Sequence, residues 1–334
     1  MASADNRPVI GVDVGGTKVA AAALAGREIT FGVEHPTELS GAEELLDGIE
    51  KAVREVIEKV GEPSAVGVGV PSQVHFDSGT VVASVNIPLE GIAVREELSG
   101  RLGVPVLLDN DGNCAALAEA QYVDGGPASH LVMYTLGTGV GGGIIIDGRI
   151  YRGATGLGAE LGHVVIQADG PECPGACPNH GCLEAYCSGQ ALERDAEALA
   201  RERPDSRLAR ALESDGGITG KEVVRAAEDG DEDAVELMRK FGVWLGVGLS
   251  GALNTFEPQH IVIGGGLSQG HSLFLGAAIE EARSRALPAI VEPVRIDVAR
   301  AGPGAGVIGA GLLASLEQAG NGDTDRSTGT EGAR

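Results

Sequence analysis

The sequence predicts an α/β protein built from two similar halves. Two glycine-rich hairpins support this: residues 8–24, PVIGVDVGGTKVAAAAL, and residues 131–150, LVMYTLGTGVGGGIIIDGRI. Each has an apolar run, a turn of glycine and threonine, and a second apolar run. In addition, helical apolar patterns alternate with strand-like segments along the chain. We therefore expect an internal duplication, in which two α/β halves face each other and both hairpins line one cleft.

The first half alternates strands and helices. After the first hairpin, apolar side chains from Leu45 to Val60 recur at helical spacing. Ser40 and Glu43 predict a capping box at the start of this helix. The segments AVGVGVP and VPVLLDN are typical of buried strands, and the second runs directly into a helical segment, DGNCAALAEAQ.

The second half becomes mostly helical. Residues 231–256 predict a long helix, followed by the strands IVIGGG and VRIDVAR and a last helix that begins near Gly306. The apolar face of the long helix comprises Val235, Met238, Phe241, Leu245, Leu249 and Leu253. Residues 319–334 are polar and rich in glycine, which predicts disorder. We expect a small domain of residues 1–112 plus about 301–318, and a large domain of residues 113–300.

Charge and hydropathy exclude several classes of partner. The chain has 48 acidic and 25 basic residues, a net charge of −23, and this charge repels nucleic acids and anionic lipids. No run of 18 apolar residues exists, and the N-terminus lacks a basic segment followed by an apolar one. We expect a cytoplasmic protein with neither a nucleic-acid nor a membrane partner.

The glycine turns are candidate phosphate sites, because backbone N–H groups can approach a phosphate where no Cβ intervenes. Asp13 precedes Gly15, Gly16 and Thr17 and adds a carboxylate that can hold hydrated Mg²⁺. A plain hairpin is the alternative. Residues 137–142 fit G-x-G-x-x-G, but a strand follows instead of a helix; residues 11–18 reverse the Lys and Ser/Thr order of a P-loop.

A second polar group follows the strand VPVLLDN. Asp109, Asn110 and Asp111 lie where that strand ends and a helix begins, and ligands of α/β folds gather at such ends. An aspartate that only caps the helix is the alternative. A hydroxyl that attacks a phosphate needs a base to accept its proton, and an aspartate serves this purpose.

Four of the five cysteines lie between residues 173 and 187, in CPGACPNHGCLEAYC. A disulfide, a metal site, a reactive thiol and packing are the possible explanations. A reducing cytoplasm argues against a disulfide.

In combination, several segments resemble the ROK family (repressors, open reading frames and kinases), and within it the bacterial glucokinase-like sugar kinases. The resemblance covers residues 9 to about 314 and rests on GVDVGGTK, GVGVPS, NDGN, TLGTGVGGGI, GAELGH, GCLEAYCSG, IVIGGG and AGVIGAGLLA. It implies an actin-like, hexokinase-type fold of two α/β domains around a cleft. The implied activity is the ATP-dependent phosphorylation of a hexose at its 6-hydroxyl, with glucose as the expected sugar.

The resemblance also implies residue roles. Asp111 is the implied catalytic base, and the implied sugar contacts are Asn86, Asn110, Asp111, Glu160, His163 and Glu184. ATP, its phosphates and Mg²⁺ would be bound by Asp13, Gly15, Gly16, Thr17, Lys18, Gly137, Thr138, Gly139, Gly264, Gly265 and Gly266. A homodimer is also implied, and the long helix around Trp244 would serve either as core or as interface.

Relatives in this family bind a structural zinc ion, and the ligands implied here are His163, Cys173, Cys177 and Cys182. Three residues separate Cys173 from Cys177, where relatives usually have one intervening residue, and His180 is the substitute that the sequence offers. Cys114 and Cys187 fall outside this pattern and are expected to be small buried residues.

Three other functions remain open at this stage. The first is a kinase for N-acetylmannosamine, mannose, fructose or allose. The second is a sugar-responsive repressor, against which the net charge argues. Repressors of this family carry an N-terminal helix-turn-helix of several dozen residues, whereas the first strand expected here starts by residue 8. The third is an inactive sugar or nucleotide sensor, against which Asp111 argues.

Overall fold

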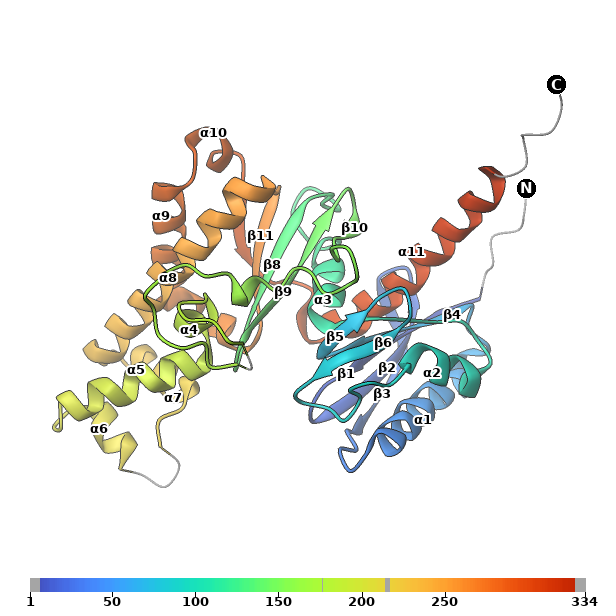
Figure 1. Ribbon diagram of the computed structural model, residues 1–334, viewed down its shortest axis with the longest axis horizontal. Helices are drawn as coiled ribbons and strands as arrows, with labels where there is room; N and C mark the ends of the chain where they lie inside the picture. The colour runs from blue at the N-terminus through green and yellow to red at the C-terminus, as the bar shows by residue number, and fades with distance from the viewer. Residues whose placement is uncertain (1–6, 176, 214–216, 328–334) are drawn as a thin grey trace. The chain divides into compact units, whose positions relative to one another are not determined.

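Two five-stranded sheets organise the chain (Figure 1). The computed structural model describes residues 7–175, 177–213 and 217–327, with side chains described up to residue 316. The first compact unit contains the chain up to Pro127, Arg149–Ala159, and the chain from Ala301 onward. The second contains Ala128–Gly148 and Glu160–Arg300.

The sheet of the first unit has the strand order β3-β2-β1-β4-β7. Its strands are β1 (Val9–Val14), β2 (Lys18–Ala25), β3 (Glu28–Pro36), β4 (Ala65–Val70) and β7 (Val106–Asn110). The strands β1, β2 and β3 pair antiparallel, whereas β4 is parallel to both β1 and β7. The first predicted hairpin is therefore β1–β2.

The second sheet repeats this arrangement with the order β10-β9-β8-β11-β12. Its strands are β8 (Leu131–Leu136), β9 (Val140–Ile146), β10 (Arg149–Ile150), β11 (His260–Gly264) and β12 (Arg295–Val298). Again a hairpin, β8–β9, is antiparallel, and β11 is parallel to both β8 and β12. The shared strand order confirms the predicted duplication.

Helices pack on the first sheet and bury their apolar faces against it. They are α1 (Ala42–Val60), α2 (Val94–Leu102), α3 (Asp111–Glu119) and α11 (Ala305–Ser327), and a small hairpin of β5 (Ser72–His75) and β6 (Thr80–Ser84) accompanies them. Leu45, Ile49 and Val53 of α1 are fully buried in the core. The predicted capping box is wrong: the helix begins at Ala42, one residue later than expected, so its N-cap is Gly41, in extended conformation and without a side-chain cap.

Close backbone contacts hold α11 against β1 and β4. A Cβ built on Gly11 would lie 1.9 Å from the carbonyl oxygen of Val307, and one on Gly67 would lie 1.8 Å from that of Ala310. No side chain fits at either position, so these two glycines allow the helix to approach the sheet directly.

We expect Gly67→Ala to destabilise the protein by more than about 3 kcal/mol, since the added methyl group forces helix and strand apart. Gly48→Ala in α1 is the matched control, because its Cβ would meet nothing within 4 Å. That control is expected to stabilise the protein by about 0.5–1 kcal/mol. Urea unfolding measures both effects, and equal stabilities of the two variants would contradict the packing described here.

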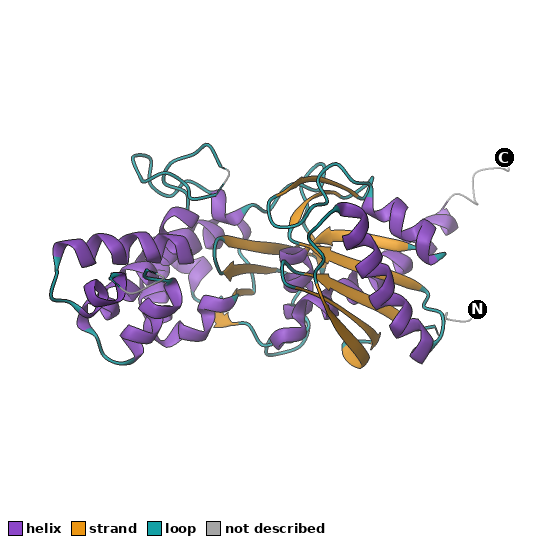
Figure 2. Cartoon of the chain, turned by 90° about the horizontal axis from the view of Figure 1, so that it is seen from below, coloured by secondary structure: helices purple, strands orange, loops and turns teal. Residues whose placement is uncertain are grey.

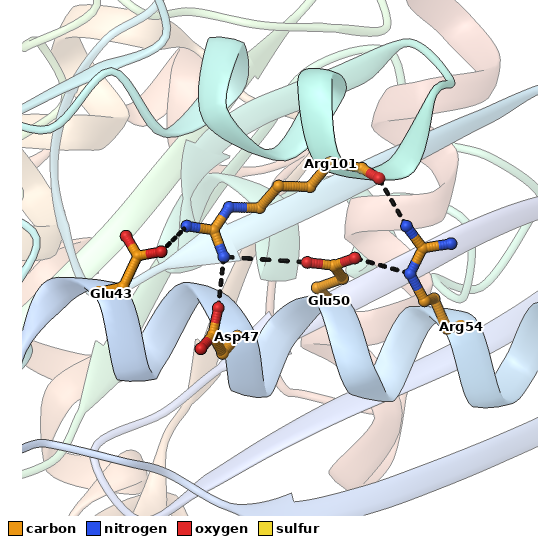
Figure 3. Close-up of polar contacts among 5 residues, drawn as sticks. All are labelled: Glu43, Asp47, Glu50, Arg54 and Arg101. Atoms are coloured by element: carbon orange, nitrogen blue, oxygen red, sulfur yellow. Dashed lines mark hydrogen bonds and ion pairs between the residues drawn. The ribbon is translucent and has the colours of Figure 1, made fainter.

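A charged network links α1 to the last turn of α2 (Figure 3). The guanidinium of Arg101 donates to Asp47 at 2.5 Å and to Glu43 at 2.6 Å, and lies 3.8 Å from Glu50. Arg54 donates to Glu50 and to the backbone carbonyl of Arg101. The Arg101 side chain is only 16% exposed, so it is screened less than an ordinary surface arginine.

Arg101→Ala is therefore expected to cost about 1–2 kcal/mol in low salt and less in 1 M salt. Arg285→Ala, which removes an exposed pair with Glu281 one helical turn away, is expected to cost less than about 0.5 kcal/mol. Thermal unfolding at two ionic strengths checks both values. An Arg101→Ala loss that does not depend on salt would show that packing, not charge, joins the two helices.

Apart from its sheet, the second unit is mostly helical (Figure 2). Its helices are α4 (Glu184–Cys187), α5 (Gly189–Glu202), α6 (Arg207–Leu212), α7 (Gly220–Glu228), α8 (Glu232–Phe256), α9 (Leu275–Arg285) and α10 (Pro288–Val291), with 3₁₀ turns at Leu161–His163 and Gly266–Leu273. A third 3₁₀ turn, Gly302–Gly304, precedes α11 in the first unit. The predicted apolar face of α8 is buried, except for Val235 in its first turn, which is 42% exposed.

The boundaries between the units differ from those expected. Helix α3 and residues 149–159 group with the first unit. Helix α3 packs on α11 so closely that a Cβ on Gly309 would lie 1.7 Å from the carbonyl oxygen of Cys114.

The chain end also differs, because α11 extends to Ser327 across most of the segment expected to be disordered. The packed first turns of α11 already provide a nucleus, so this extension does not bear the cost of helix nucleation. Residues 328–334 lie outside the described part of the chain. None of the helices in the described residues combines the length and apolar character needed to span a bilayer.

Candidate active site and metal cluster

The start of α3 holds the carboxylate that the sequence singled out. Asn110 is the N-cap, and its Oδ1 accepts hydrogen bonds from the backbone N–H groups of Gly112 at 2.8 Å and Asn113 at 3.2 Å. Its Nδ2 donates to Asp111 Oδ1 at 3.0 Å. The helix cap is therefore Asn110 and neither neighbouring aspartate, so Asp111 is not needed as a cap.

The surroundings of Asp111 favour its protonated form. Burial, followed by the negative charge of Asp13, raises the pKa of Asp111 to about 6, while hydrogen bonds from Gly112 and Asn110 act in the opposite direction. A carboxyl with a pKa near 6 is deprotonated at neutral pH and still accepts a proton readily. The structure thus brings Asp111 and Asp13 near each other and makes the Asp111 carboxylate more basic than an ordinary aspartate.

Asp13 lies near the end of β1 and faces the start of α11. A Cβ on Gly306 would lie 2.4 Å from its carboxylate, so only glycine allows this approach. Burial raises the pKa of Asp13; Lys18 lowers it and Glu34 raises it again. An acidic group near a helix N-terminus, beside a glycine turn, provides oxygen ligands of the kind that Mg²⁺ prefers.

The β1–β2 turn is tight and accessible. The Gly15 N–H donates to the Lys18 carbonyl at 2.8 Å, and Thr37 Oγ1 donates to the Gly15 carbonyl at 2.7 Å. A Cβ on Gly16 would meet nothing within 4 Å, and both Gly16 and Thr17 are exposed. The ammonium group of Lys18 pairs with Glu34 at 2.6 Å.

Asn86, in the segment after β6, is exposed.

The β8–β9 turn of the second unit is closed by its own backbone. The Gly137 N–H donates to the Gly139 carbonyl at 2.9 Å, and N–H groups at the start of α5 donate to the carbonyls of Gly137 and Thr138. Gly265, with φ of 83°, lies against this turn, since its Cβ would be 2.4 Å from the Leu136 carbonyl oxygen. The structure therefore brings residues 137–139 and 264–266 together.

Glu184 joins this turn to the cysteine segment, a link that the sequence did not predict. It is 7% exposed, and its Oε2 accepts a hydrogen bond from the Val140 N–H at 2.7 Å. A Cβ on Gly139 would lie 2.5 Å from that oxygen. Cys173 Sγ lies 3.6 Å from the other oxygen, Oε1. Glu160, in contrast, is exposed beside the 3₁₀ turn that ends at His163.

Four side chains of the second unit form a cluster of metal-ligand type. One ligand atom from each of His163, Cys173, Cys177 and Cys182 lies within 4.8 Å of the others. Cys173 Sγ is 3.5 Å from His163 Nδ1, and the sulfur atoms of Cys177 and Cys182 are 3.8 Å apart.

These distances match a tetrahedral zinc site. With Zn–S bonds of about 2.3 Å and a Zn–N bond of about 2.0 Å, tetrahedral angles separate two sulfurs by about 3.8 Å and a sulfur and a nitrogen by about 3.5 Å. Burial raises the pKa of the Cys173 thiol to about 12, and nearby Cys182, Glu184 and Cys177 add to this, whereas a bound cation favours the thiolate. The residues present therefore fit zinc.

The cluster also bears on the alternatives considered for the cysteines. Sulfurs 3.8 Å apart do not form a disulfide, whose bond length is about 2.05 Å, and all five cysteines are free. The wider CPGAC spacing still brings Cys173 to the cluster, whereas His180 is exposed and outside it. Cys114 and Cys187 are fully buried, in agreement with a packing role.

The sequence also gave no indication of Arg152, which donates to buried Asp109 at 2.6 Å. A single arginine in a glycine-rich loop belongs to no motif, so only the structure reveals this pair.

Comparisons with known proteins agree with the observed fold. The model of the ROK family matches residues 9–317. A glucokinase of Halalkalibacterium halodurans is 32% identical to this chain, over 94% of the chain and 96% of that protein.

Two solved structures are similar along nearly the whole chain. A ROK hexokinase from Thermus thermophilus superposes with a TM-score of 0.82 and 33% identity, over 94% of this chain and 99% of that one. A ROK family glucokinase from Streptomyces griseus, in complex with glucose and AMPPNP, gives a TM-score of 0.76 and 34% identity, over 92% and 99% respectively.

Proposed function

Because the chain belongs to the ROK family, we propose that it is an ATP-dependent sugar kinase that phosphorylates the 6-hydroxyl of a hexose, with glucose as the sugar. The observation that carries this proposal is Asp111, a carboxylate held by Asn110 at the start of α3, with its pKa raised to about 6. The similarity to glucokinases over most of the chain supports the choice of sugar.

In this proposal Asp111 takes the proton of the sugar hydroxyl as that oxygen attacks the γ-phosphate of ATP. The transition state of phosphoryl transfer is loose, so the hydroxyl needs little activation before attack. A base with a pKa near 6 is ionised at pH 7 and accepts the proton late in the transfer. The backbone N–H of Gly112 and the Asn110 amide keep the carboxylate oriented.

Sugar recognition is assigned to Asn86, Asn110, Asp111, Glu160, His163 and Glu184. Amides and carboxylates bind vicinal hydroxyls well, and a sugar that lacks the matching hydroxyl leaves such a group unpaired. Since His163 Nδ1 faces Cys173, its Nε2 is the ring nitrogen that serves the sugar. Glu184 already accepts hydrogen bonds from the Val140 N–H and from Cys173 Sγ, so it offers the sugar the acceptor capacity that remains.

The nucleotide phosphates and the Mg²⁺ that accompanies ATP are assigned to Asp13 with Gly15, Gly16, Thr17 and Lys18, and to Gly137, Thr138 and Gly139. Gly264, Gly265 and Gly266 are assigned to the adenosine. The open space over Gly16 and the proximity of Gly265 to the 137–139 turn support these roles. Lys18 must leave Glu34 to reach a phosphate, a small change for an exposed ion pair.

We also assign a structural zinc ion to His163, Cys173, Cys177 and Cys182, on the basis of the tetrahedral distances. When bound, the ion would cross-link the cysteine segment and orient the His163 ring. The protein is further proposed to be a cytoplasmic homodimer. The dimer follows from the family resemblance, and sedimentation velocity would test it.

An assay of ADP release over a panel of sugars tests the activity, with Asp111→Ala as the control. The panel contains glucose, mannose, fructose, allose and N-acetylmannosamine, and we expect the highest kcat/KM with glucose. A different preferred sugar would correct the substrate, and no turnover with any sugar would contradict the kinase. Salt-sensitive binding to operator DNA in a gel-shift experiment would instead support a repressor.

A further inference from the structure

Arg152 makes a buried ion pair that none of the roles above uses. Its Nε donates to Asp109 Oδ2 at 2.6 Å, and the two side chains are 15% and 3% exposed. The other carboxylate oxygen of Asp109 accepts from the Asn110 N–H and from Asn113 Nδ2, both at 2.8 Å. Asp109 therefore joins Arg152 to the first turn of α3.

The same guanidinium lies over an aromatic ring. The Arg152 guanidinium carbon is 3.6 Å from the centre of the Phe76 ring, which lies just after β5. The Phe76 N–H donates to the Thr155 carbonyl at 3.3 Å, and a Cβ on Gly156 would lie 2.6 Å from the Phe76 nitrogen. These contacts with Phe76 hold the loop 152–158 against the β5–β6 hairpin.

Three segments that contain or lead to proposed sugar contacts therefore meet at one side chain. The first is α3, which is capped by Asn110 and begins at Asp111; the second is the β5–β6 hairpin, which leads to Asn86; the third is the loop 152–158, which is followed by Glu160. All the contacts of Arg152 described here lie within the first unit.

The chemistry of arginine suits this position. A planar guanidinium donates along its edge to a carboxylate while its face covers an aromatic ring. An ammonium group has no such planar face and does not combine the two contacts in this way. A buried charge is costly unless it is paired and hydrogen-bonded, so these contacts hold the arginine in one place. Loss of Arg152 would leave Asp109 buried without its counter-charge and would release the loop from Phe76.

We propose that Arg152 is a positioning residue for the sugar site, acting through Asp109 on Asn110 and Asp111, and through Phe76 on the loop that leads to Glu160. This inference rests on the proposed kinase function. It assigns to Arg152 no contact with the sugar or with ATP.

Steady-state kinetics of Arg152→Ala test the proposal. We expect kcat/KM for the sugar to fall by about 100-fold, with part of the loss in sugar KM, because misplacement of about 1 Å has an effect of this size. The KM for ATP should change less than about 2-fold. Arg152→Lys should recover only part of the activity, since it restores the charge and not the planar stack.

Arg95 provides a matched control. It lies 5.4 Å from the centre of the same Phe76 ring and donates to the backbone carbonyls of Phe76 and Asp77. Arg95→Ala should lower thermal stability but leave the sugar KM within about 2-fold of the parent. The double variant Arg152→Ala with Asp109→Asn should be no slower than the worse single variant, because the two residues act as one unit.

Hydrogen exchange gives a readout that does not depend on activity. In Arg152→Ala the amides of Asn110 and Phe76 should exchange faster than in Arg95→Ala. The acceptor of the Asn110 amide is Asp109, which pairs with Arg152, and the acceptor of the Phe76 amide is the Thr155 carbonyl, which lies in the loop that begins with Arg152. An active parent whose sugar KM and kcat are unchanged in folded Arg152→Ala overturns the proposal. A parent that phosphorylates no sugar contradicts the proposed function, and the exchange data then show separately whether Arg152 orders these segments.

Discussion

Asp111→Asn is expected to abolish phosphoryl transfer and at the same time to stabilise the folded protein. The amide keeps an oxygen that can accept from the Gly112 N–H, but it cannot take the proton of the sugar hydroxyl. We expect kcat to fall by about 100-fold or more. A kcat within about 10-fold of the parent would contradict the role of Asp111 as base.

The stabilisation follows from the direction of the pKa shift of Asp111. Its folded-state pKa of about 6 is above the ordinary value, so the folded state binds the proton more tightly than the unfolded chain. The free energy of unfolding therefore falls as the pH rises from about 4 to 6, and the cost persists above pH 6. The rise of the Asp111 pKa from its ordinary value to about 6 corresponds to about 3 kcal/mol of unfolding free energy. Because the carboxyl is partly exposed, we expect Asp111→Asn to gain about 1–3 kcal/mol.

The measurement is urea unfolding of the parent and of Asp111→Asn at pH 5 and pH 7.5. The variant should gain more over the parent at pH 7.5 than at pH 5. Asp205→Asn, at an exposed site, is the control and should change neither stability nor kcat. The kcat of the parent should also rise with pH through the pKa of the bound enzyme, which Mg²⁺ beside Asp13 would shift below 6.

The second large effect concerns the metal cluster. Cys182→Ser is expected to remove zinc and to lower the free energy of unfolding by several kcal/mol, because three remaining ligands hold the ion weakly. The sugar KM should rise strongly, since His163 belongs to the cluster and Glu184 contacts it through Cys173. Metal analysis, thermal unfolding and the sugar assay provide the three measurements.

Two further variants isolate the ligand set. Cys187→Ser should retain one zinc per chain, because the Cys187 sulfur lies beside the Phe241 carbonyl, away from the cluster. His180→Ala should also retain zinc, whereas Cys173→Ser should lose it. Full zinc content in Cys173→Ser, or loss of zinc in His180→Ala, would show that His180 takes the fourth position.

Motifs that are local in sequence were predicted well. Both hairpins, the strand before Asp111 and the start of α11 follow from residues close together in the chain, because glycine turns and apolar periodicity act over a few residues. The exceptions are local too: Gly41 replaced Ser40 as the cap of α1, and Val235 is exposed in the first turn of α8. At helix ends, tertiary packing decides between neighbouring residues.

The sequence by itself determined the α/β duplication, the glycine turns, and the residue types of a candidate metal site and of the proposed catalytic base. Only the tertiary structure decided that Cys173, and not His180, joins the cluster, that Glu184 bonds to Val140, and that Arg152 pairs with Asp109. Glu184 and Arg152 lie 44 and 43 residues from their partners. Periodicity carries no information across such distances, since the pairing depends on how sheets and loops pack, and each buried charge then requires the partner that the packing provides.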